Sequence, residues 1–242
     1  MAASFAKFKE TFIFNFIEGA RWKYITNGLL VTLEVTFFSL LLGIAIGVVV
    51  AMIRSSYDQM KDELRPGPGG TLLKLLNEIS RLYLTVIRGT PVVVQLLIGY
   101  FVIFVTSTNT VFVASMVFGI NSGAYITEII RGGIMSIDHG QFEAGRSIGL
   151  NYIQTMRYII IPQAFKNVLP SLANEFIALL KETAVCGYIG LMDLTKGGDV
   201  IRGRTFTAYM PLLAVALIYL ILVIFFSWLV GKLERRLRNS ER

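Results

Sequence analysis

Four polar side chains interrupt stretches that are otherwise apolar: Glu34, Glu128, Asn174 and Glu175. An ionisable group in hydrocarbon is costly, and it usually faces a polar pathway or pairs with another charge. We therefore expect these residues to line a path for a polar solute. For Glu128 the structural alternative is an ion pair with Arg131 or Arg88 near the cytoplasmic face.

Residues suited to catalysis or metal binding are scarce. Cys186 is the single cysteine and His139 the single histidine. An internal disulfide and a multi-cysteine metal site are therefore excluded, and a Ser-His-Asp triad or a histidine zinc site has few possible partners. The sequence also contains no GxxxxGK[ST] phosphate loop. We expect no catalytic residue, no metal and no ATP site in this chain.

A second group of residues indicates a mechanical role. Between two apolar blocks lie Glu143-Ala144-Gly145, then Gly149, and then Ile159, Ile161 and Pro162. Residues 143–148 can form a short helix whose small residues at 144 and 145 allow another surface to approach closely. Gly149 then permits a sharp exit, and Pro162 can start the next helix. The spacing predicts a rigid lever that contacts a partner.

Composition places these residues in a membrane protein. The 242 residues are 54% hydrophobic and 16% charged, and the mean hydropathy is +0.63. About a quarter of a soluble protein is charged, and roughly 20 apolar residues cross a bilayer as one helix. We predict an all-α membrane protein with five spans, at about 26–53, 82–105, 111–130, 164–180 and 208–230. The net charge is +7, and the basic residues lie in the segments between the apolar blocks. This distribution is typical of membrane topology and argues against nucleic-acid binding.

The segments outside the spans have distinct compositions. Residues 1–24 carry Phe5, Phe8, Phe12 and Phe16 at helical spacing, which predicts an amphipathic interfacial helix. The run Arg65-Pro66-Gly67-Pro68-Gly69-Gly70 predicts a non-helical turn before an amphipathic stretch, Leu72 to Ile79. Within the spans, Pro91 can break or merely kink a helix, and Gly43 and Gly47 favour close helix packing. Residues 232–242 form a basic tail.

Lysine and arginine are more frequent in 54–81, 131–166 and 232–242 than in 1–25 and 181–207. Positive residues concentrate on the cytoplasmic side of a membrane. We therefore expect the N-terminus outside and the C-terminus in the cytoplasm.

The segment at about 138–162 resembles the EAA loop of binding-protein-dependent ABC importers, with Gly145 in place of the last Ala and Ile161 in place of Leu. Three other stretches resemble polar amino acid permeases. They are Arg88-Gly89-Thr90-Pro91 with Gln95-Leu96, Ser122-Gly123-Ala124-Tyr125 with the following Glu128 and Arg131-Gly132-Gly133, and Lys181-Glu182-Thr183. The chain is thus similar to the permease subunit of such an importer.

The resemblance implies a type I ABC importer permease fold in residues 25–231, in the inner membrane of a prokaryote. It implies that Glu143, Ala144, Gly145, Gly149 and Pro162 form the coupling site for a separate ATPase. The expected partners are a second permease subunit, identical or homologous, two ABC ATPases that bind ATP and Mg, and an extracytoplasmic solute-binding protein. The expected substrate is a polar amino acid. The alternatives are an ATP-independent secondary transporter or channel, and an integral-membrane enzyme.

The predicted orientation has a direct test. A cysteine at Ser56 should react with a membrane-impermeant thiol reagent only from the cytoplasmic side, and a cysteine at Thr108 only from outside, because the reagent cannot cross the bilayer. Labelling of intact cells and of inverted vesicles distinguishes the two sides. The reverse labelling pattern would overturn the orientation.

Overall fold

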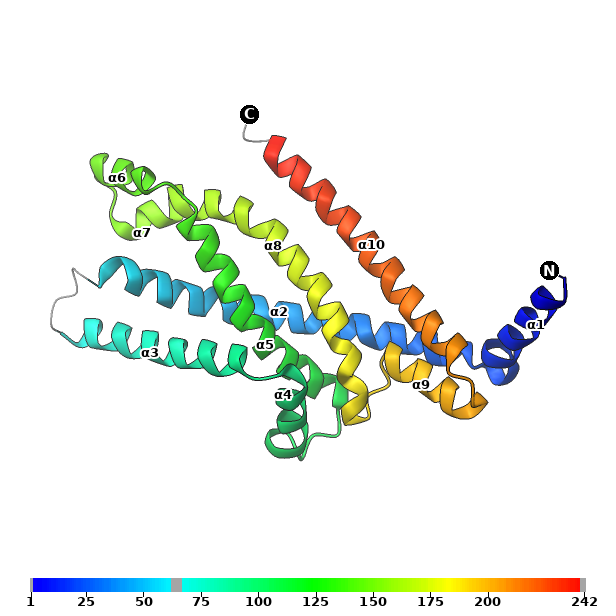
Figure 1. Ribbon diagram of the computed structural model, residues 1–242. Coiled ribbons are helices and arrows are strands. Elements are labelled where there is room, and N and C mark those ends of the chain that lie inside the picture. Colours follow the sequence, from blue (N-terminus) through cyan, green and yellow to red (C-terminus); the bar gives the residue numbers. More distant parts are fainter. Residues whose placement is uncertain (1, 62–66, 240–242) are drawn as a thin grey trace. The chain divides into compact units, whose positions relative to one another are not determined.

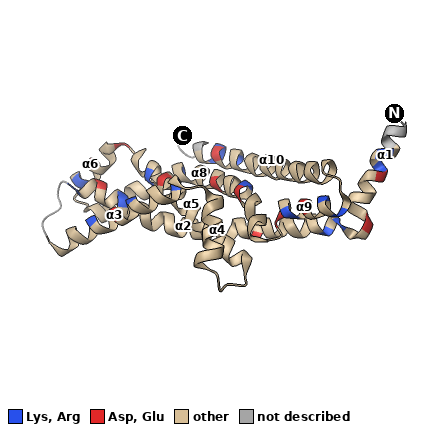
Figure 2. Cartoon of the chain, turned by 60° about the horizontal axis from the view of Figure 1, so that its bottom comes forward, with Lys and Arg blue, Asp and Glu red and all other residues tan. Residues whose placement is uncertain are grey.

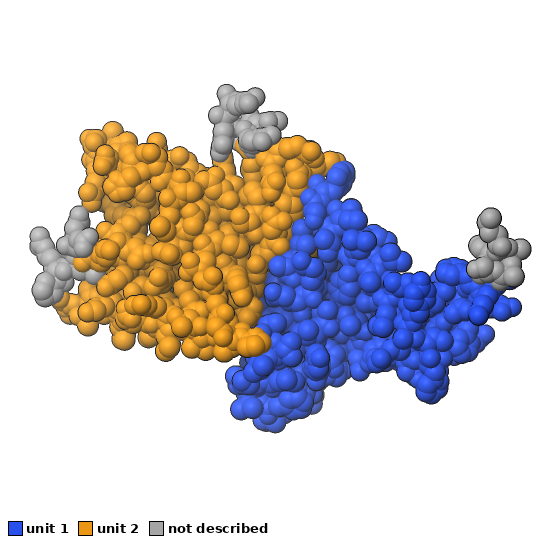
Figure 3. All heavy atoms as spheres, in the orientation of Figure 1, with its two compact units in different colours: residues 1–39, 92–118, 177–228 blue, residues 40–91, 119–176, 229–242 orange. Residues whose placement is uncertain are grey.

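The computed structural model describes residues 2–61 and 67–239, and every regular element in these ranges is helical (Figure 1). The predicted all-α class is therefore confirmed for this part of the chain. The chain divides into two compact units (Figure 3). Unit 1 comprises residues 1–39, 92–118 and 177–228, and unit 2 comprises residues 40–91, 119–176 and 229–242.

The helices follow one another with short connections. They are α1 (Ala2–Phe12), α2 (Trp22–Met60), α3 (Pro68–Gly89), α4 (Val92–Ile98), α5 (Thr110–Met135), α6 (His139–Ser147), α7 (Tyr152–Thr155), α8 (Ile161–Glu182), α9 (Leu194–Thr205) and α10 (Tyr209–Asn239). Single π-helical turns extend α1, α4 and α7, at Ile13–Ile17, Gly99–Ile103 and Met156–Ile160. Short 3₁₀ segments at Glu18–Ala20 and Thr183–Ile189 precede α2 and follow α8.

Three helices in the described ranges are long and apolar enough to cross a membrane, namely α2, α5 and α10. The pair Pro68–Gly89 and Val92–Ile103 adds a fourth if it forms one span. Few charged residues occur along α10 before its C-terminal end (Figure 2). The helix α8 covers the predicted fourth span at 164–180 but is more polar, and five spans stay a prediction. The helix α10 continues to Asn239, so most of the predicted basic tail is helical, and residues 240–242 lie outside the described ranges.

The second predicted span, at about 82–105, does not run as one helix; the sequence left open whether Pro91 breaks or merely kinks it. The helix α3 ends at Gly89, and α4 begins at Val92. Thr90 between them is extended, with φ −121° and ψ 144°. A residue before proline is pushed away from helical angles by the proline ring. Pro91 therefore breaks the helix.

The start of α3 also differs from the prediction. The run of prolines and glycines was expected to exclude helix, but Pro68, Gly69 and Gly70 form the first turn of α3. Proline suits this position because its φ angle is already helical and its missing N–H is not needed there. The Thr71 N–H donates to the Gly67 carbonyl at 3.1 Å. Arg65 and Pro66, in the same run, lie outside the described residues.

In unit 2, glycines let α2 and α5 approach closely. A Cβ atom at Gly47 would lie 2.5 Å from Cγ2 of Ile126, and one at Gly43 would lie 3.1 Å from the Ser122 hydroxyl oxygen. Across the same contact, a Cβ atom at Gly123 would lie 3.0 Å from Ile46. The predicted packing role of Gly43 and Gly47 is confirmed.

In unit 1, α9 packs against the start of α2 and against the end of the N-terminal segment. The shared core consists of Phe16, Ile25, Leu194, Ile201 and Val215. Asn15 is fully buried, and its carbonyl oxygen accepts a hydrogen bond from the Thr205 hydroxyl at 3.0 Å. The N-terminal segment is helical as predicted. The last of the four phenylalanines at helical spacing, Phe16, is buried in this core, whereas Phe8 and Phe12 are exposed.

The contact of α9 with α2 predicts a large difference between two glycines of the same helix. A Cβ atom at Gly197 would lie 2.4 Å from the Tyr24 carbonyl oxygen, whereas nothing lies within 4 Å of one at Gly203. Overpacking costs about 1–3 kcal/mol, so Gly197→Ala should lower the melting temperature of the purified protein. Gly203→Ala should leave it unchanged or raise it slightly, because alanine favours helix by up to about 1 kcal/mol. Equal shifts in thermal unfolding for the two variants would contradict the close contact.

Candidate functional site

Residues 138–162 form an ordered helical hairpin in unit 2. Its first helix, α6, begins after Asp138, whose carboxylate accepts a hydrogen bond from the Gly140 N–H at 2.7 Å. The helix ends before Gly149, which has a φ angle of +82°. Asn151 and Gln154 then exchange side-chain and backbone hydrogen bonds at 2.9 Å and cap α7. The predicted helix at 143–148 is confirmed, and it starts earlier, at His139.

Gly149 provides the sharp exit that the sequence predicts. Its left-handed backbone angle is one that residues with a Cβ atom rarely adopt. The turn is closed by hydrogen bonds from the Gly149 N–H to the Arg146 carbonyl at 2.9 Å and from the Leu150 N–H to the Gly145 carbonyl at 3.0 Å. The geometry is typical of a helix C-terminus that ends at a glycine.

The two small residues of α6 face different surroundings. Gly145 is buried, and a Cβ atom there would lie 2.7 Å from the Thr155 side chain of α7. The surface that approaches Gly145 is thus part of the same chain, and not an outside partner as we expected. Ala144 and Glu143 are exposed. Gly145 closes the hairpin, and Ala144 and Glu143 remain free to contact another protein.

The tip of the hairpin exposes large apolar side chains that the motif does not contain. Ile148 and Ile153 are each 73% exposed. Isolated exposed apolar residues are common, but two isoleucines that flank a conformationally fixed turn suit a docking surface. These two isoleucines were not predicted from the sequence, because the identity of a single apolar residue does not show on which side of a hairpin it lies.

Pro162 was expected to start a helix, and this expectation is wrong in part. Pro162 is the second residue of α8, but the chain is already helical from Tyr152 through the π turn at Met156–Ile160. The Ile161 N–H donates to the Met156 carbonyl in this wider turn. A π turn is one way for a helix to absorb a local irregularity. Burial of Tyr152, at the start of this helical path, raises the pKa of its hydroxyl.

Glu175 reaches from α8 to α5. Its carboxylate accepts a hydrogen bond from the Ser122 hydroxyl at 2.8 Å, and the side chain is half-buried. Asn174, the next residue, is exposed, and its amide donates to the Pro170 carbonyl of its own helix at 3.1 Å. The two neighbours therefore point to different surroundings, and Glu175 alone bridges two helices.

Glu128 has the ion-pair role that the sequence left open. Its carboxylate lies 3.7 Å from Nε of Arg131, and the Arg131 guanidinium donates to Asp58 of α2 at 2.8 Å. Glu34, in unit 1, is exposed on α2. Glu128 and Glu175, both in unit 2, have separate partners.

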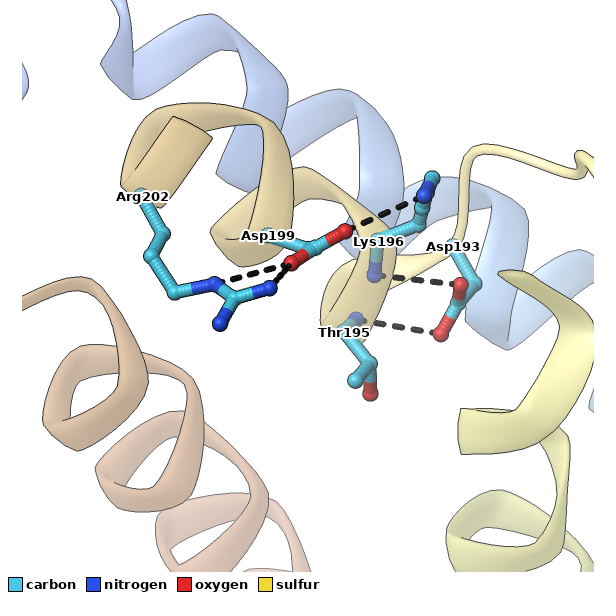
Figure 4. Close-up of polar contacts among 5 residues, drawn as sticks. All are labelled: Asp193, Thr195, Lys196, Asp199 and Arg202. Carbon is cyan, nitrogen blue, oxygen red and sulfur yellow. Dashed lines mark hydrogen bonds and ion pairs between the residues drawn. The ribbon is translucent and has the colours of Figure 1, made fainter. Parts of the chain in front are cut away.

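The sequence analysis did not predict α9. Its N-terminus is capped by Asp193, whose carboxylate accepts from the Thr195 N–H at 3.0 Å and the Lys196 N–H at 3.2 Å (Figure 4). Burial raises the pKa of Asp193, and these hydrogen bonds oppose the rise. An aspartate directly before a helix is a recognisable start signal, so this helix could have been predicted.

The exposed face of α9 carries a charged ladder. Asp199 accepts from the Lys196 ammonium at 3.1 Å and from Nε of Arg202 at 2.9 Å (Figure 4). These contacts, at helical spacing, hold the pKa of Asp199 below its usual range. No group of three or more metal-ligating side chains occurs within the described residues.

Comparison with known proteins places this arrangement in a family. Residues 71–239 match the binding-protein-dependent transport system inner membrane component family. The chain is 35% identical over 217 or 218 residues to several glutamine transport system permeases, including that of Escherichia coli K12, with 88% of this chain and 93% of the relative covered. It is 34% identical to the arginine transport system permease of Bacillus subtilis 168 over 221 residues, which are 90% of this chain and 94% of that protein.

Two solved structures have the same fold. A crystal structure of an amino acid ABC transporter with histidines has a TM-score of 0.79 and 37% identity, and covers 91% of this chain and 98% of its own. An inward-facing structure of the MetNI methionine ABC transporter has a TM-score of 0.74 and 21% identity, with 89% and 97% covered.

The chain therefore belongs to the family of binding-protein-dependent transport system inner membrane components. It is a permease subunit of an ABC transporter, located in the membrane and without catalytic activity of its own; ATP hydrolysis belongs to a partner ATPase. The family in general combines a permease with a partner permease, an ATPase and a binding protein.

Proposed function

We propose that this chain is the membrane subunit of an ATP-driven importer for a polar amino acid. The observation that carries the proposal is the ordered, exposed hairpin of α6 and α7, in a chain whose relatives include permeases for glutamine and arginine. In the proposed assembly, five spans place the N-terminus outside and this hairpin in the cytoplasm. A second permease subunit and two ATPases with ATP and Mg complete the transporter.

The hairpin supports a coupling role because it is joined firmly to the helices of unit 2. Gly145 packs on Thr155, and α7 continues through the π turn into α8. Ile134 of α5 packs in one buried cluster with Met156, Ile160 and Ala164. A displacement of α6 by an ATPase would therefore move α5 and α8 with it. Glu143, Ala144 and Gly149, with Ile148 and Ile153, are the contacts that we assign to the ATPase.

Transport then requires two arrangements of the spans whose equilibrium nucleotide binding shifts through the hairpin. Glu175 is our candidate for contact with the substrate. It is a half-buried carboxylate that accepts a hydrogen bond from the Ser122 hydroxyl, and it can attract the ammonium group of an amino acid. Asn174 lies beside it, and Glu34 is a second exposed candidate. The ion pair with Arg131 makes Glu128 a structural residue instead.

A binding protein would deliver the amino acid at the outer face in this orientation. The helix α9 lies in the segment that we place outside, between α8 and α10. Its Lys196, Asp199 and Arg202 offer both signs of charge on an exposed face. Mixed charges of this kind favour specific, salt-dependent association.

Variants of the hairpin test the coupling. Ala144→Asp should strongly weaken co-purification of the ATPase, because an unpaired charge buried at an interface costs several kcal/mol. The matched control is Ala208→Asp, at an exposed alanine outside the hairpin.

Gly149→Val should leave the ATPase bound but allow hydrolysis without transport, because strain of about 1–3 kcal/mol at a left-handed position misaims α6. Gly149→Asn should behave almost normally, since asparagine tolerates this backbone angle.

Proteoliposomes that contain the permease, its ATPase and the binding protein provide the measurement. Uptake of labelled glutamine or arginine should stop without ATP even when ion gradients are kept, and competition among glutamine, arginine, histidine and glutamate identifies the substrate. Uptake that follows an ion gradient alone supports a secondary transporter. Normal import and normal ATPase binding by both Ala144→Asp and Gly149→Val would falsify the coupling role.

Glu175→Gln tests the pathway separately, because it removes the charge and keeps an acceptor for Ser122. Substrate-stimulated ATP hydrolysis should fall several-fold while the ATPase remains bound, and Glu78→Gln, at an exposed position of α3, should have no effect. Unchanged stimulation and unchanged substrate preference in Glu175→Gln would exclude Glu175 from the pathway.

A further inference from the structure

An exposed apolar row runs along α3 in unit 2. Its members lie three or four residues apart, on one side of the helix. They are Leu72, Leu75 and Ile79, each 56% exposed, Leu82, 65% exposed, and Val86, 50% exposed. The opposite side of α3 is buried at Asn77, Ser80 and Leu84. The row therefore faces away from the rest of unit 2.

A row of basic residues lies on another side of α3. Lys74, Arg81 and Arg88 are exposed and lie seven residues apart, which is about two helical turns. Basic residues are visible along α3 in Figure 2. The spacing keeps the three charges on one flank of the helix. At about 100° per residue, this row lies roughly 130° around α3 from the apolar row and next to the buried side of the helix.

Next to this flank, α2 contributes a further arginine. Arg54 donates from Nη1 to the Asn77 side chain at 3.3 Å, while its Nε atom is buried and has no hydrogen-bond partner within residues 2–61 and 67–239. Arg54, Arg81 and Arg88 line a cavity of about 400 Å³, together with Leu84, Thr85 and Glu128. The guanidinium of Arg88 lies 5.7 Å from the ring centre of Tyr125, a contact that orients it.

The charges of this cavity favour an anion. Three guanidinium groups face one carboxylate, Glu128, which is already paired with Arg131. A zwitterionic amino acid has no net charge and would leave the excess uncompensated. Guanidinium groups match the oxygens of a phosphate in geometry and charge. The cavity therefore suits a phosphate group better than it suits the transported solute.

We propose that this site binds the headgroup of an anionic phospholipid. The phosphate lies among Arg54, Arg81 and Arg88, and an acyl chain lies along the exposed apolar row of α3. The exposed apolar row of the same helix favours a lipid over a free phosphate, since a lipid supplies both a phosphate and an apolar chain. Basic pockets beside membrane helices commonly bind anionic headgroups.

Lipid retention tests the proposal on the purified full chain. After exchange into mixed phosphatidylglycerol and phosphatidylcholine, native mass spectrometry should show at least a tenfold preference for phosphatidylglycerol. The double variant Arg81→Gln/Arg88→Gln should lose this preference. Lys9→Gln/Lys23→Gln, which changes the net charge equally at exposed positions elsewhere, should keep it. Arg81→Lys/Arg88→Lys should keep part of it, and this variant separates loss of charge from loss of folding.

Three results would overturn the proposal. The first is equal retention of the two lipids, either by the unaltered protein or by both Arg81→Gln/Arg88→Gln and Lys9→Gln/Lys23→Gln. The second is the same rise in melting temperature with millimolar inorganic phosphate as with phosphatidylglycerol, which would assign the cavity to a free anion. The third is efficient disulfide formation between two chains that carry Ile79→Cys, which would make this face a subunit interface. A preference for phosphatidylglycerol that is lost only when Arg81 and Arg88 are changed to glutamine supports the lipid site.

Discussion

Hydrocarbon offers no hydrogen-bond partner, and this constraint governs where polar groups can lie in the chain. Helices satisfy the backbone within each segment. Buried hydroxyl groups bond to their own helix, as Thr36 does to the Thr32 carbonyl at 2.7 Å and Thr127 to the Gly123 carbonyl at 2.7 Å. Others reach a neighbouring helix, as Ser39 of α2 does to the Ser115 carbonyl at 3.3 Å. A polar side chain that reaches a second helix, such as Glu175, is therefore a good candidate for function.

Close packing is the second consequence of this environment. Lipid tails are as apolar as leucine, so helices gain most from direct van der Waals contact, and small residues permit it. The contacts of Gly47 with α5 and of Gly197 with Tyr24 leave no room for a Cβ atom, and the contact of Gly43 with α5 leaves little. Gly145 uses the same device outside the spans, where it joins α6 to α7. A single type of contact thus builds both the helix bundle and the hairpin.

Exposed apolar residues suit a protein contact in the hairpin and a lipid contact in the proposed lipid site. Ile148 and Ile153 lie on a short, capped hairpin, a rigid shape that can fit a groove of another protein. The row on α3 extends over several turns of a helix that carries a line of positive charge on another side, a pattern that suits the boundary between lipid tails and headgroups. Shape and charge, and not exposure alone, distinguish the two surfaces.

The all-α class, the main apolar helices and the helix at 143–148 with its exit at Gly149 could be predicted from the sequence. They depend on local properties: the length of apolar runs, the need for glycine at a left-handed angle, and a motif with fixed spacing. Local rules also contain the information for α9 and for the start of α3 at Pro68, although we did not use them fully. The tertiary structure alone decided that Gly145 faces Thr155, that Glu175 meets Ser122, that Arg131 reaches Asp58 of α2, and that Arg54 lies beside Arg81 and Arg88. The paired residues in these contacts come from separate helices, and no local rule specifies which faces of two helices meet.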